Sequence, residues 1–267
     1  MTLRLLVAQS PAERDAARQV EARVFLHAFG NTPELLAQEY GPYEARSRFV
    51  VVIDDRSGEA LGTARLITAA ESPVKSLVDA AGEPWHLPVA DSLGTVGLAA
   101  RDVWDVGSLA VDPRYRAGAA GAEVSVALCH GLWRYARNCD VPGLVTIVDD
   151  RVRRLLRAMG VPWQPMAGAA SRPYLGSPAS TPCVLVAEMA EEEMARARPD
   201  LAPALVHGRF HSITLDPADL AATRGTVGRP PAPADRPDRT LPPRRDTTGW
   251  RPPTSRRAEQ LANPPGA

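Results

Sequence analysis

Cysteine and lysine are scarce in this chain of 267 residues, and their scarcity limits its chemistry. The three cysteines, Cys129, Cys139 and Cys183, form no CxxC pair and no spaced set with histidine, and the five histidines show no ligand spacing. The sequence therefore predicts no structural zinc and no other metal site. An odd, sparse cysteine count is typical of a reducing compartment. Lys75 is the only lysine, so nearly all of the positive charge is arginine.

Long apolar runs are also lacking. The N-terminal segment MTLRLLVAQSPAERD turns polar too early for the core of a signal peptide. No stretch reaches the roughly 20 apolar residues that span a bilayer. With 31 basic and 31 acidic residues, the net charge gives no reason to expect nucleic-acid binding. We therefore expect a cytoplasmic protein without a membrane span.

The C-terminal part differs in composition from the rest. From Arg229 onward there are eight arginines, four acidic residues and ten of the 26 prolines. Such a segment buries too little apolar surface to offset the entropy cost of ordering it. We therefore predict one folded domain over residues 1–224 and a disordered Pro/Arg-rich tail over 225–267.

The folded part reads as an alternation of strands and helices. Ser10, Pro11 and Glu13 form a capping box at the start of a helix over about 10–29, and residues 48–55 and 59–68 form a β-hairpin around Gly58. The remaining expected elements are strands 3–8, 103–112, 144–150 and 181–190, and helices near 33–39, 74–81, 119–137 and 150–159, followed by helical patches over 191–224. This order predicts an α/β (α+β) fold with a mixed, mostly antiparallel twisted sheet flanked by helices.

Small residues follow the strand over 103–112. The stretch LAVDPRYRAGAAG leads into a long helix, whose first backbone N–H groups have no internal partners. Small residues let an anion approach these groups, so the turn is a candidate phosphate cradle. This pattern resembles the acyl-CoA-binding motif of the GNAT N-acyltransferase superfamily, with Ala119 in place of a motif glycine. The resemblance implies a GNAT-like fold and a cofactor site built from Leu109, Val111, Arg116, Ala117, Gly118, Ala119 and Gly121.

A narrower resemblance covers residues 20–190. The blocks ARVFLHAFG, EYGPYE, GTARLIT and WDVGSLAV are similar, in that order, to blocks of acyl-homoserine-lactone (autoinducer) synthases and long-chain N-acyl amino acid synthases. Four positions depart from these patterns: Ala119, Ser108 in place of arginine, Gly41 in place of an acid, and Leu156 where acetyl-CoA-dependent GNATs often carry tyrosine. The resemblance implies an acyl-CoA or acyl-phosphopantetheine co-substrate and a small-molecule amine acceptor.

The candidates for the chemistry of acyl transfer are Asp105, Arg65 and Glu44. Asp105 stands in a strand of Val and Trp, where burial raises the pKa of a carboxyl group toward that of a general base; an exposed acid on an edge strand is the alternative. Arg65 is expected to clamp substrate or to form an ion network with Glu44 and Glu39, with an ordinary surface arginine as the alternative. Gly107 suggests a bulge in this strand, because glycine often marks one. A bulge would let a backbone N–H near residues 107–109 donate to the thioester carbonyl oxygen.

These observations predict an N-acyltransferase that moves an acyl group from a thioester to an amine by direct attack. Two alternatives stay open: an acetyl-CoA N-acetyltransferase, and a non-catalytic thioester-binding or regulatory module. Arginines 151, 153, 154 and 157 crowd one helix and would attract an acidic acyl carrier protein, although solvated arginines explain them equally well.

Overall fold

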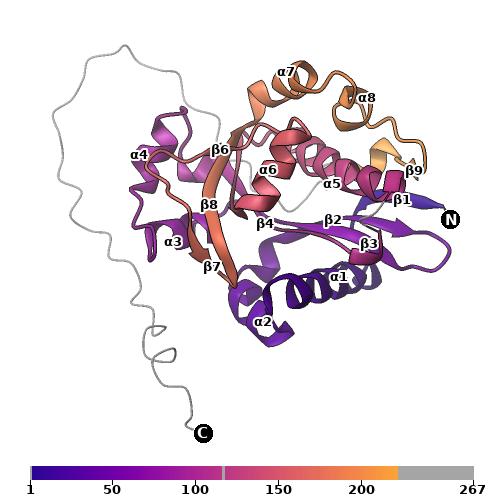
Figure 1. The fold of residues 1–267 in the computed structure, drawn as a ribbon, viewed down its shortest axis with the longest axis horizontal. Helices are drawn as coiled ribbons and strands as arrows, with labels where there is room; N and C mark the ends of the chain where they lie inside the picture. The colour runs from indigo at the N-terminus through magenta and orange to yellow at the C-terminus, as the bar shows by residue number, and fades with distance from the viewer. Residues whose placement is uncertain (1, 116–117, 222–267) are drawn as a thin grey trace, which may run out of the picture. The chain divides into compact units, whose positions relative to one another are not determined.

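The central feature of the protein is a single mixed sheet. The computed structural model describes residues 2–115 and 118–221, without the side chains of 118–120. Within these residues the sheet has nine strands: eight follow the order β6-β8-β5-β4-β3-β2-β1-β9, and β7, the ninth, pairs with β8 (Figure 1). Neighbours are antiparallel except for β4 with β5 and β1 with β9. The predicted tail, 225–267, lies outside the described residues.

The strands follow the predicted apolar runs closely. Their bounds are β1 Leu3–Val7, β2 Ser47–Asp54, β3 Ala60–Ile67, β4 Val103–Val111, β5 Gly143–Asp149, β6 Gln164–Pro165, β7 Arg172–Tyr174, β8 Ser177–Val186 and β9 Ile213–Thr214. The hairpin β2–β3 turns at Gly58, whose φ of 72° lies in the left-handed region that glycine tolerates. One prediction was too long: the strand expected over 181–190 ends at Val186, because the helix-forming run Ala-Glu-Met-Ala begins α7. The short strands β6, β7 and β9 were not predicted.

Helices cover both faces of the sheet. The structure has α1 Pro11–Phe29, α2 Pro33–Tyr40, α3 Lys75–Ala81, α4 Val89–Gly94, α5 Gly118–Asn138, α6 Asp150–Ala158, α7 Ala187–Ala197 and α8 Ala202–Leu205. Short 3₁₀ turns lie at Gly41–Arg46, Ala100–Asp102, Pro113–Tyr115 and Pro217–Leu220. Among the described residues no helix is both long and apolar enough to cross a membrane. The predicted capping box of α1 is present, with the Glu13 N–H donating to Ser10 Oγ.

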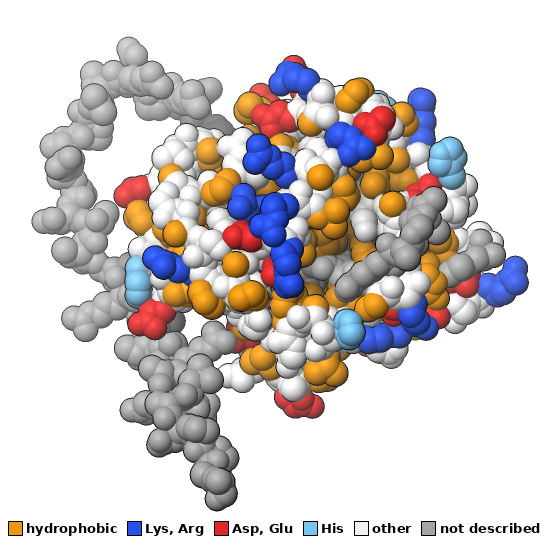
Figure 2. Space-filling model, in the orientation of Figure 1, with side chains coloured by type: hydrophobic (Ala, Val, Ile, Leu, Met, Phe, Trp, Pro, Cys, Tyr) orange, Lys and Arg blue, Asp and Glu red, His pale blue; other side chains and the backbone are white. Residues whose placement is uncertain are grey.

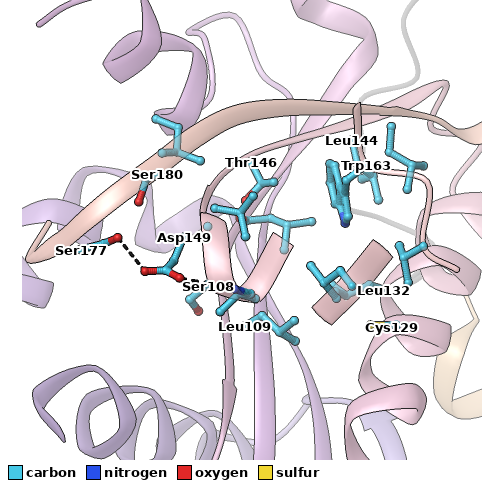
Figure 3. Close-up of a pocket in the computed structure, with 18 of the residues that line it drawn as sticks. Ser108, Leu109, Cys129, Leu132, Leu144, Thr146, Asp149, Trp163, Ser177 and Ser180 are labelled. Carbon is cyan, nitrogen blue, oxygen red and sulfur yellow. Dashed lines mark hydrogen bonds between the residues drawn. The ribbon is translucent and has the colours of Figure 1, made fainter. Parts of the chain in front are cut away.

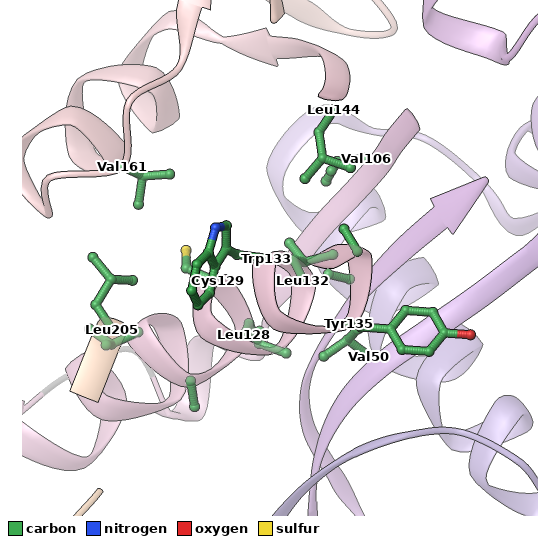
Figure 4. Packing of buried hydrophobic residues seen from close by; sticks show 14 of the residues in the cluster. Val50, Val106, Leu128, Cys129, Leu132, Trp133, Tyr135, Leu144, Val161 and Leu205 are labelled. Carbon is green, nitrogen blue, oxygen red and sulfur yellow. The ribbon is translucent and has the colours of Figure 1, made fainter. Parts of the chain in front are cut away.

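Each face of the sheet has its own hydrophobic core. Helices α1 and α2 lie on one face, and α5 and α6 lie on the other (Figure 1). On the α5 and α6 face, the core packs the predicted apolar face of α5, including Leu128, Leu132 and Tyr135, against Trp104 and Val106 of β4 (Figure 4). On the α1 and α2 face, α3 and α4 join α2 in a cluster around Leu77 and Val103. Helix α4 was not predicted, because it is short and lacks a clear periodic pattern.

Candidate functional site

Strands β4 and β5 separate in the middle of the sheet. They pair in parallel only from Val103 to Asp105, opposite Gly143 to Val145. Beyond this point the Thr146 hydroxyl donates to the Val106 carbonyl oxygen over 2.8 Å, and the Tyr40 hydroxyl donates to the Gly107 carbonyl oxygen. Side-chain hydroxyls therefore satisfy carbonyls at the place where the strand ladder ends.

A bulge lies at the same place on the other edge of β4. Ser108 pairs with Arg65 of β3 and Val106 pairs with Leu66, so Gly107 is an extra residue without its own partner on β3. A Cβ at Gly107 would approach the Tyr40 ring to 3.0 Å, so a larger side chain would have to displace this ring. The predicted bulge near Gly107 is confirmed.

An apolar cavity of about 110 Å³ occupies the gap between β4 and β5 (Figure 3). It reaches from Phe25, Phe29 and Tyr40 on the α1 and α2 side, past Gly107 and Thr146, to the α5 side. The residues that line it on the α5 side are mainly apolar: Cys129, Leu132, Trp133, Leu144, Leu156, Val161 and Met194. The separation of two parallel strands thus gives an apolar chain a route through the sheet.

Arg65 lies at the centre of a buried ion network beside this gap. Its side chain is 4% exposed, and its Nε donates to Glu21 over 3.0 Å while Nη1 donates to Glu44 over 2.8 Å. The rings of Tyr40 and Phe49 lie 4.6 and 4.5 Å from the guanidinium carbon. Burial lowers the pKa of Arg65, but the hydrogen bonds and charges of Glu21 and Glu44 outweigh this effect and raise it overall. The predicted Arg65–Glu44 pair is therefore present, and the surface-arginine alternative was wrong.

Glu21 joins this network to β4. It is 2% exposed, accepts two hydrogen bonds from Arg65, and also accepts one from the Ser108 hydroxyl. Ser108 stands where the autoinducer synthase pattern has arginine, so here a hydroxyl faces the buried carboxylate instead. The sequence analysis missed Glu21, because it is one acid among several on α1. Only the packing of α1 over β3 brings it to Arg65.

Asp105 is fully buried on the opposite face of β4 from Trp104. Its two carboxylate oxygens accept hydrogen bonds from the Ser76 N–H over 2.6 Å and the Ser76 hydroxyl over 2.7 Å, at the start of α3. Burial raises the pKa of Asp105 to about 6, against the opposing effect of these hydrogen bonds. The expected raised pKa is thus present, and the edge-strand alternative was wrong, because β4 lies between β3 and β5. Asp105 is not among the residues that line the cavity.

Lys75, the only lysine of the chain, is buried next to Ser76. Its Nζ donates to Glu39 and to the Tyr174 hydroxyl, each over 2.9 Å, and also to Asp79. Glu39, which the sequence analysis considered as a partner of Arg65, accepts a hydrogen bond from Lys75. Burial lowers the pKa of Lys75, but the charges of Asp79 and Glu39 raise it overall. Tyr174 lines the cavity, so this cluster fixes one wall of it.

Asp149 places a carboxylate in the cavity wall at the end of β5. It accepts hydrogen bonds from the Ser177 hydroxyl over 2.7 Å and from the Arg151 N–H over 2.8 Å (Figure 3). Burial raises its pKa, but Arg151 and Ser177 outweigh burial and lower it to about 2. Asp149 is therefore ionised at neutral pH. The sequence analysis predicted only that a helix begins near Asp149. This is confirmed, because Asp149 caps the N-terminus of α6.

The predicted cofactor turn is described in part. Leu109 lines the cavity, and Val111 is the half-buried last residue of β4. Arg116 and Ala117 lie outside the described residues, whereas Gly118, Ala119 and Gly121 fall in the first turns of α5. Nearby, Arg114 bonds to Asp112 and Glu59.

The arginines of α6 divide into two groups. Arg151 bonds to Asp149 and Arg153 to Asp150, whereas Arg154 and Arg157 are exposed beside Leu155, which is 56% exposed. Figure 2 shows basic side chains gathered near the middle of this face, over the position of α6 in Figure 1. The predicted basic helix is therefore present, with part of its charge neutralised.

Comparisons with known proteins identify the fold. No family model matches the sequence, and no curated protein matches it. Among solved structures, FeeM, an N-acyl amino acid synthase from uncultured soil microbes, matches with a TM-score of 0.53 at 15% identity, over 73% of this chain and 96% of that chain. BjaI, a CoA-dependent acyl-homoserine lactone synthase, matches at 10% identity over 80% of this chain and 93% of that chain, with a TM-score of 0.47.

A third match is a putative N-acetyltransferase from Lactobacillus plantarum. It is 14% identical over 70% of this chain and 99% of that chain, with a TM-score of 0.46. The assignment of the fold rests on FeeM, together with the strand order and the separation of β4 from β5. The sequence prediction is confirmed at this level: the described residues have a GNAT-like fold.

Proposed function

We propose that this protein is an N-acyltransferase that moves an acyl chain from a thioester to the amine of a small molecule. The observation that carries the proposal is the apolar cavity at the separation of β4 and β5, beside the Gly107 bulge. An acetyl group needs no such cavity. The apolar lining of the cavity therefore favours a longer acyl chain over the acetyl-CoA alternative. The likeness to an N-acyl amino acid synthase supports the same class of reaction.

The proposed reaction uses the gap as the meeting point of the two substrates. The acyl chain lies in the cavity, Leu109 and Val111 flank the thioester arm, and a backbone N–H of the bulge donates to the thioester carbonyl oxygen. The neutral amine attacks the carbonyl carbon, and the C–S bond breaks as the C–N bond forms. The attacking nitrogen loses a proton to solvent and the thiolate takes one up, so the products are an amide and a free thiol.

Arg65, Glu44 and Asp105 act as positioning residues in this proposal. Arg65 and Glu44 hold α1 and the turn after α2 against β3. The Asp105 carboxylate accepts hydrogen bonds from the N–H and the hydroxyl of Ser76, at the start of α3. Asp105 was expected to be the general base. Because it does not line the cavity, we now assign it to the placement of α3 on β4.

The donor is either an acyl-CoA or an acyl carrier protein. The turn with Arg116, Ala117, Gly118, Ala119 and Gly121 would hold the pyrophosphate of CoA. The exposed Arg154 and Arg157 would instead attract the acidic surface of a carrier protein. Release of thiol from one donor class and not from the other separates these two possibilities.

Thiol release tests the proposed function directly. The full chain is mixed with acetyl-CoA, long-chain acyl-CoAs or acyl carrier protein, together with a panel of amino acids and S-adenosylmethionine. We expect amine-dependent thiol release from long-chain donors. Release from acetyl-CoA alone would favour the acetyltransferase, and release from none would favour a non-catalytic module.

A bulky residue in the cavity wall should block the acyl donor. Leu109 is half-buried and lines the cavity, so in Leu109→Trp the larger side chain should fill part of the space that the acyl chain needs. We expect the Kd of long-chain acyl-CoA to rise at least tenfold, a loss of about 1.4 kcal/mol. Calorimetric titration measures it.

Leu155→Trp on the exposed face of α6 is the matched control, because Leu155 is not part of the cavity lining. It should bind the acyl-CoA like the parent chain. Equal affinities for the two variants would show that the chain binds elsewhere.

A further inference from the structure

The indole N–H of Trp133 is a buried hydrogen-bond donor without a partner. Trp133 is 4% exposed, and none of the described residues accepts a hydrogen bond from its Nε1. Buried indole N–H groups usually find a partner. An unsatisfied donor of this kind costs stability. A fold that retains such a group in a ligand cavity has a donor available for the ligand.

The donor faces the cavity. Trp133 lines it, and Figure 4 shows the indole nitrogen on the side of the ring toward Val161 and Leu144, which also line it. Two neighbours hold the ring: the Arg137 guanidinium carbon lies 5.6 Å from its centre, and the His130 ring lies 6.3 Å away. The direction of the N–H is thus set by packing.

This donor lies far from the bulge where the thioester would react. Leu144, toward which the indole nitrogen lies, pairs with Trp104 in the part of β5 that still pairs with β4, whereas the bulge lies at Gly107, further along β4. Three residue steps of strand separate the level of Leu144 from Gly107, a distance of about 10 Å at the usual rise per residue. Trp133 therefore meets the distal part of any chain that enters from the bulge.

We propose that the cavity selects acyl chains that carry a ketone oxygen in their distal part, which accepts the Trp133 N–H. This inference rests on the proposed function and adds the substrate class. A ketone oxygen only accepts hydrogen bonds, and this suits the surroundings, because Leu144, Val161 and Leu132 offer no side-chain acceptor. A distal hydroxyl also has to donate, and the sulfur atoms of Cys129 and Met194, which line the same cavity, are weak acceptors.

Binding of free fatty acids tests the inference without turnover. Calorimetry compares dodecanoic acid with two derivatives, one with a ketone next to the terminal methyl group and one with a ketone beside the carboxylate end. We expect the full chain to bind the distal ketone about tenfold more tightly than the other two, the value of one hydrogen bond to a buried donor. Equal affinities, tighter binding of the proximal ketone, or no binding of any acid would overturn the inference.

Trp133→Phe isolates the N–H, because it keeps an aromatic ring in the same place. The tenfold preference should disappear in this variant, mainly through weaker binding of the distal ketone. Trp163→Phe, the same change at a half-buried wall of the cavity, should keep the preference. A preference that survives in Trp133→Phe would overturn the inference, and the comparison of ligands on the parent chain needs no variant to fold.

The outcome is separable from that of the proposed function. Thiol release decides whether the protein transfers acyl groups, whereas fatty-acid binding decides which chain the cavity prefers. Thiol release with no distal-ketone preference would leave acyl transfer in place and remove the inference. Ketone selectivity without thiol release would indicate a binding module that keeps the chain specificity.

Discussion

Arg65→Met should lower the free energy of unfolding by about 3–5 kcal/mol, the cost of leaving a buried carboxylate without its cation. Glu21, 2% exposed, would keep only the hydrogen bond from Ser108. For a domain of this size the expected fall in Tm is about 10 °C. Urea denaturation gives the free energy, and thermal denaturation gives Tm.

Two further variants test the cause. Arg18 also bonds to Glu44, but its side chain is 39% exposed, so Arg18→Met should cost less than about 1 kcal/mol. In the double variant Arg65→Met/Glu21→Leu the unpaired charge is gone, and much of the stability should return. If Arg65→Met costs no more than Arg18→Met, the network does not stabilise the fold. Thiol release at a low temperature, where Arg65→Met is still folded, separates this stability effect from any effect on turnover.

Local signals predicted most of the fold. Ser10, Pro11 and Glu13 mark the start of α1 because their side chains satisfy the first N–H groups of that helix. The β2–β3 hairpin follows from apolar strands around Gly58. The signal fails for very short elements such as α4 and β9, whose position depends on the residues they pack against rather than on a periodic pattern.

The candidate site was predicted in part, for a related reason. Arg65 stood out because a charged residue interrupts an apolar strand, and Glu44 because the block EYGPYE resembles the acidic block of autoinducer synthases. The structure brings the two together. Glu21 and Lys75 reach the site through the packing of α1 and α3 on the sheet, which no local pattern reports. Trp133 looks like an ordinary core residue of α5 until the separation of β4 and β5 opens a cavity beside it.

Asp105 should make this protein more stable as the pH falls from about 7 to about 4, relative to an Asp105→Asn variant. Its pKa of about 6 in the folded state lies above the usual value of 3.8, so the folded state binds the proton more tightly than the unfolded state. The ionised carboxylate therefore costs stability above pH 6, and protonation removes that cost. The full difference approaches about 3 kcal/mol, at 1.36 kcal/mol per pKa unit.

The comparison with Asp105→Asn is needed because other carboxylates act in the opposite direction. Glu44, Asp112 and Asp149 have lowered pKa values in the folded state. Their protonation as the pH falls therefore lowers the stability of the protein. These groups are the same in both proteins, so their contributions cancel in the difference. Urea denaturation of both proteins at several pH values measures it. A difference that stays constant with pH would show that Asp105 does not titrate in this range.

The same variant separates the two roles considered for Asp105. A general base contributes about 10²–10⁴-fold to the rate, and its loss would also remove a step near pH 6 from the pH–rate profile. A carboxylate that only anchors Ser76 affects turnover through the position of α3, so the rate should fall less than tenfold while its pH dependence keeps its shape. Because both oxygens of Asp105 are occupied by Ser76 and the side chain lies outside the cavity wall, we expect the second result. A hundredfold loss with a changed profile would restore Asp105 as the base and require it to reach the amine through Ser76.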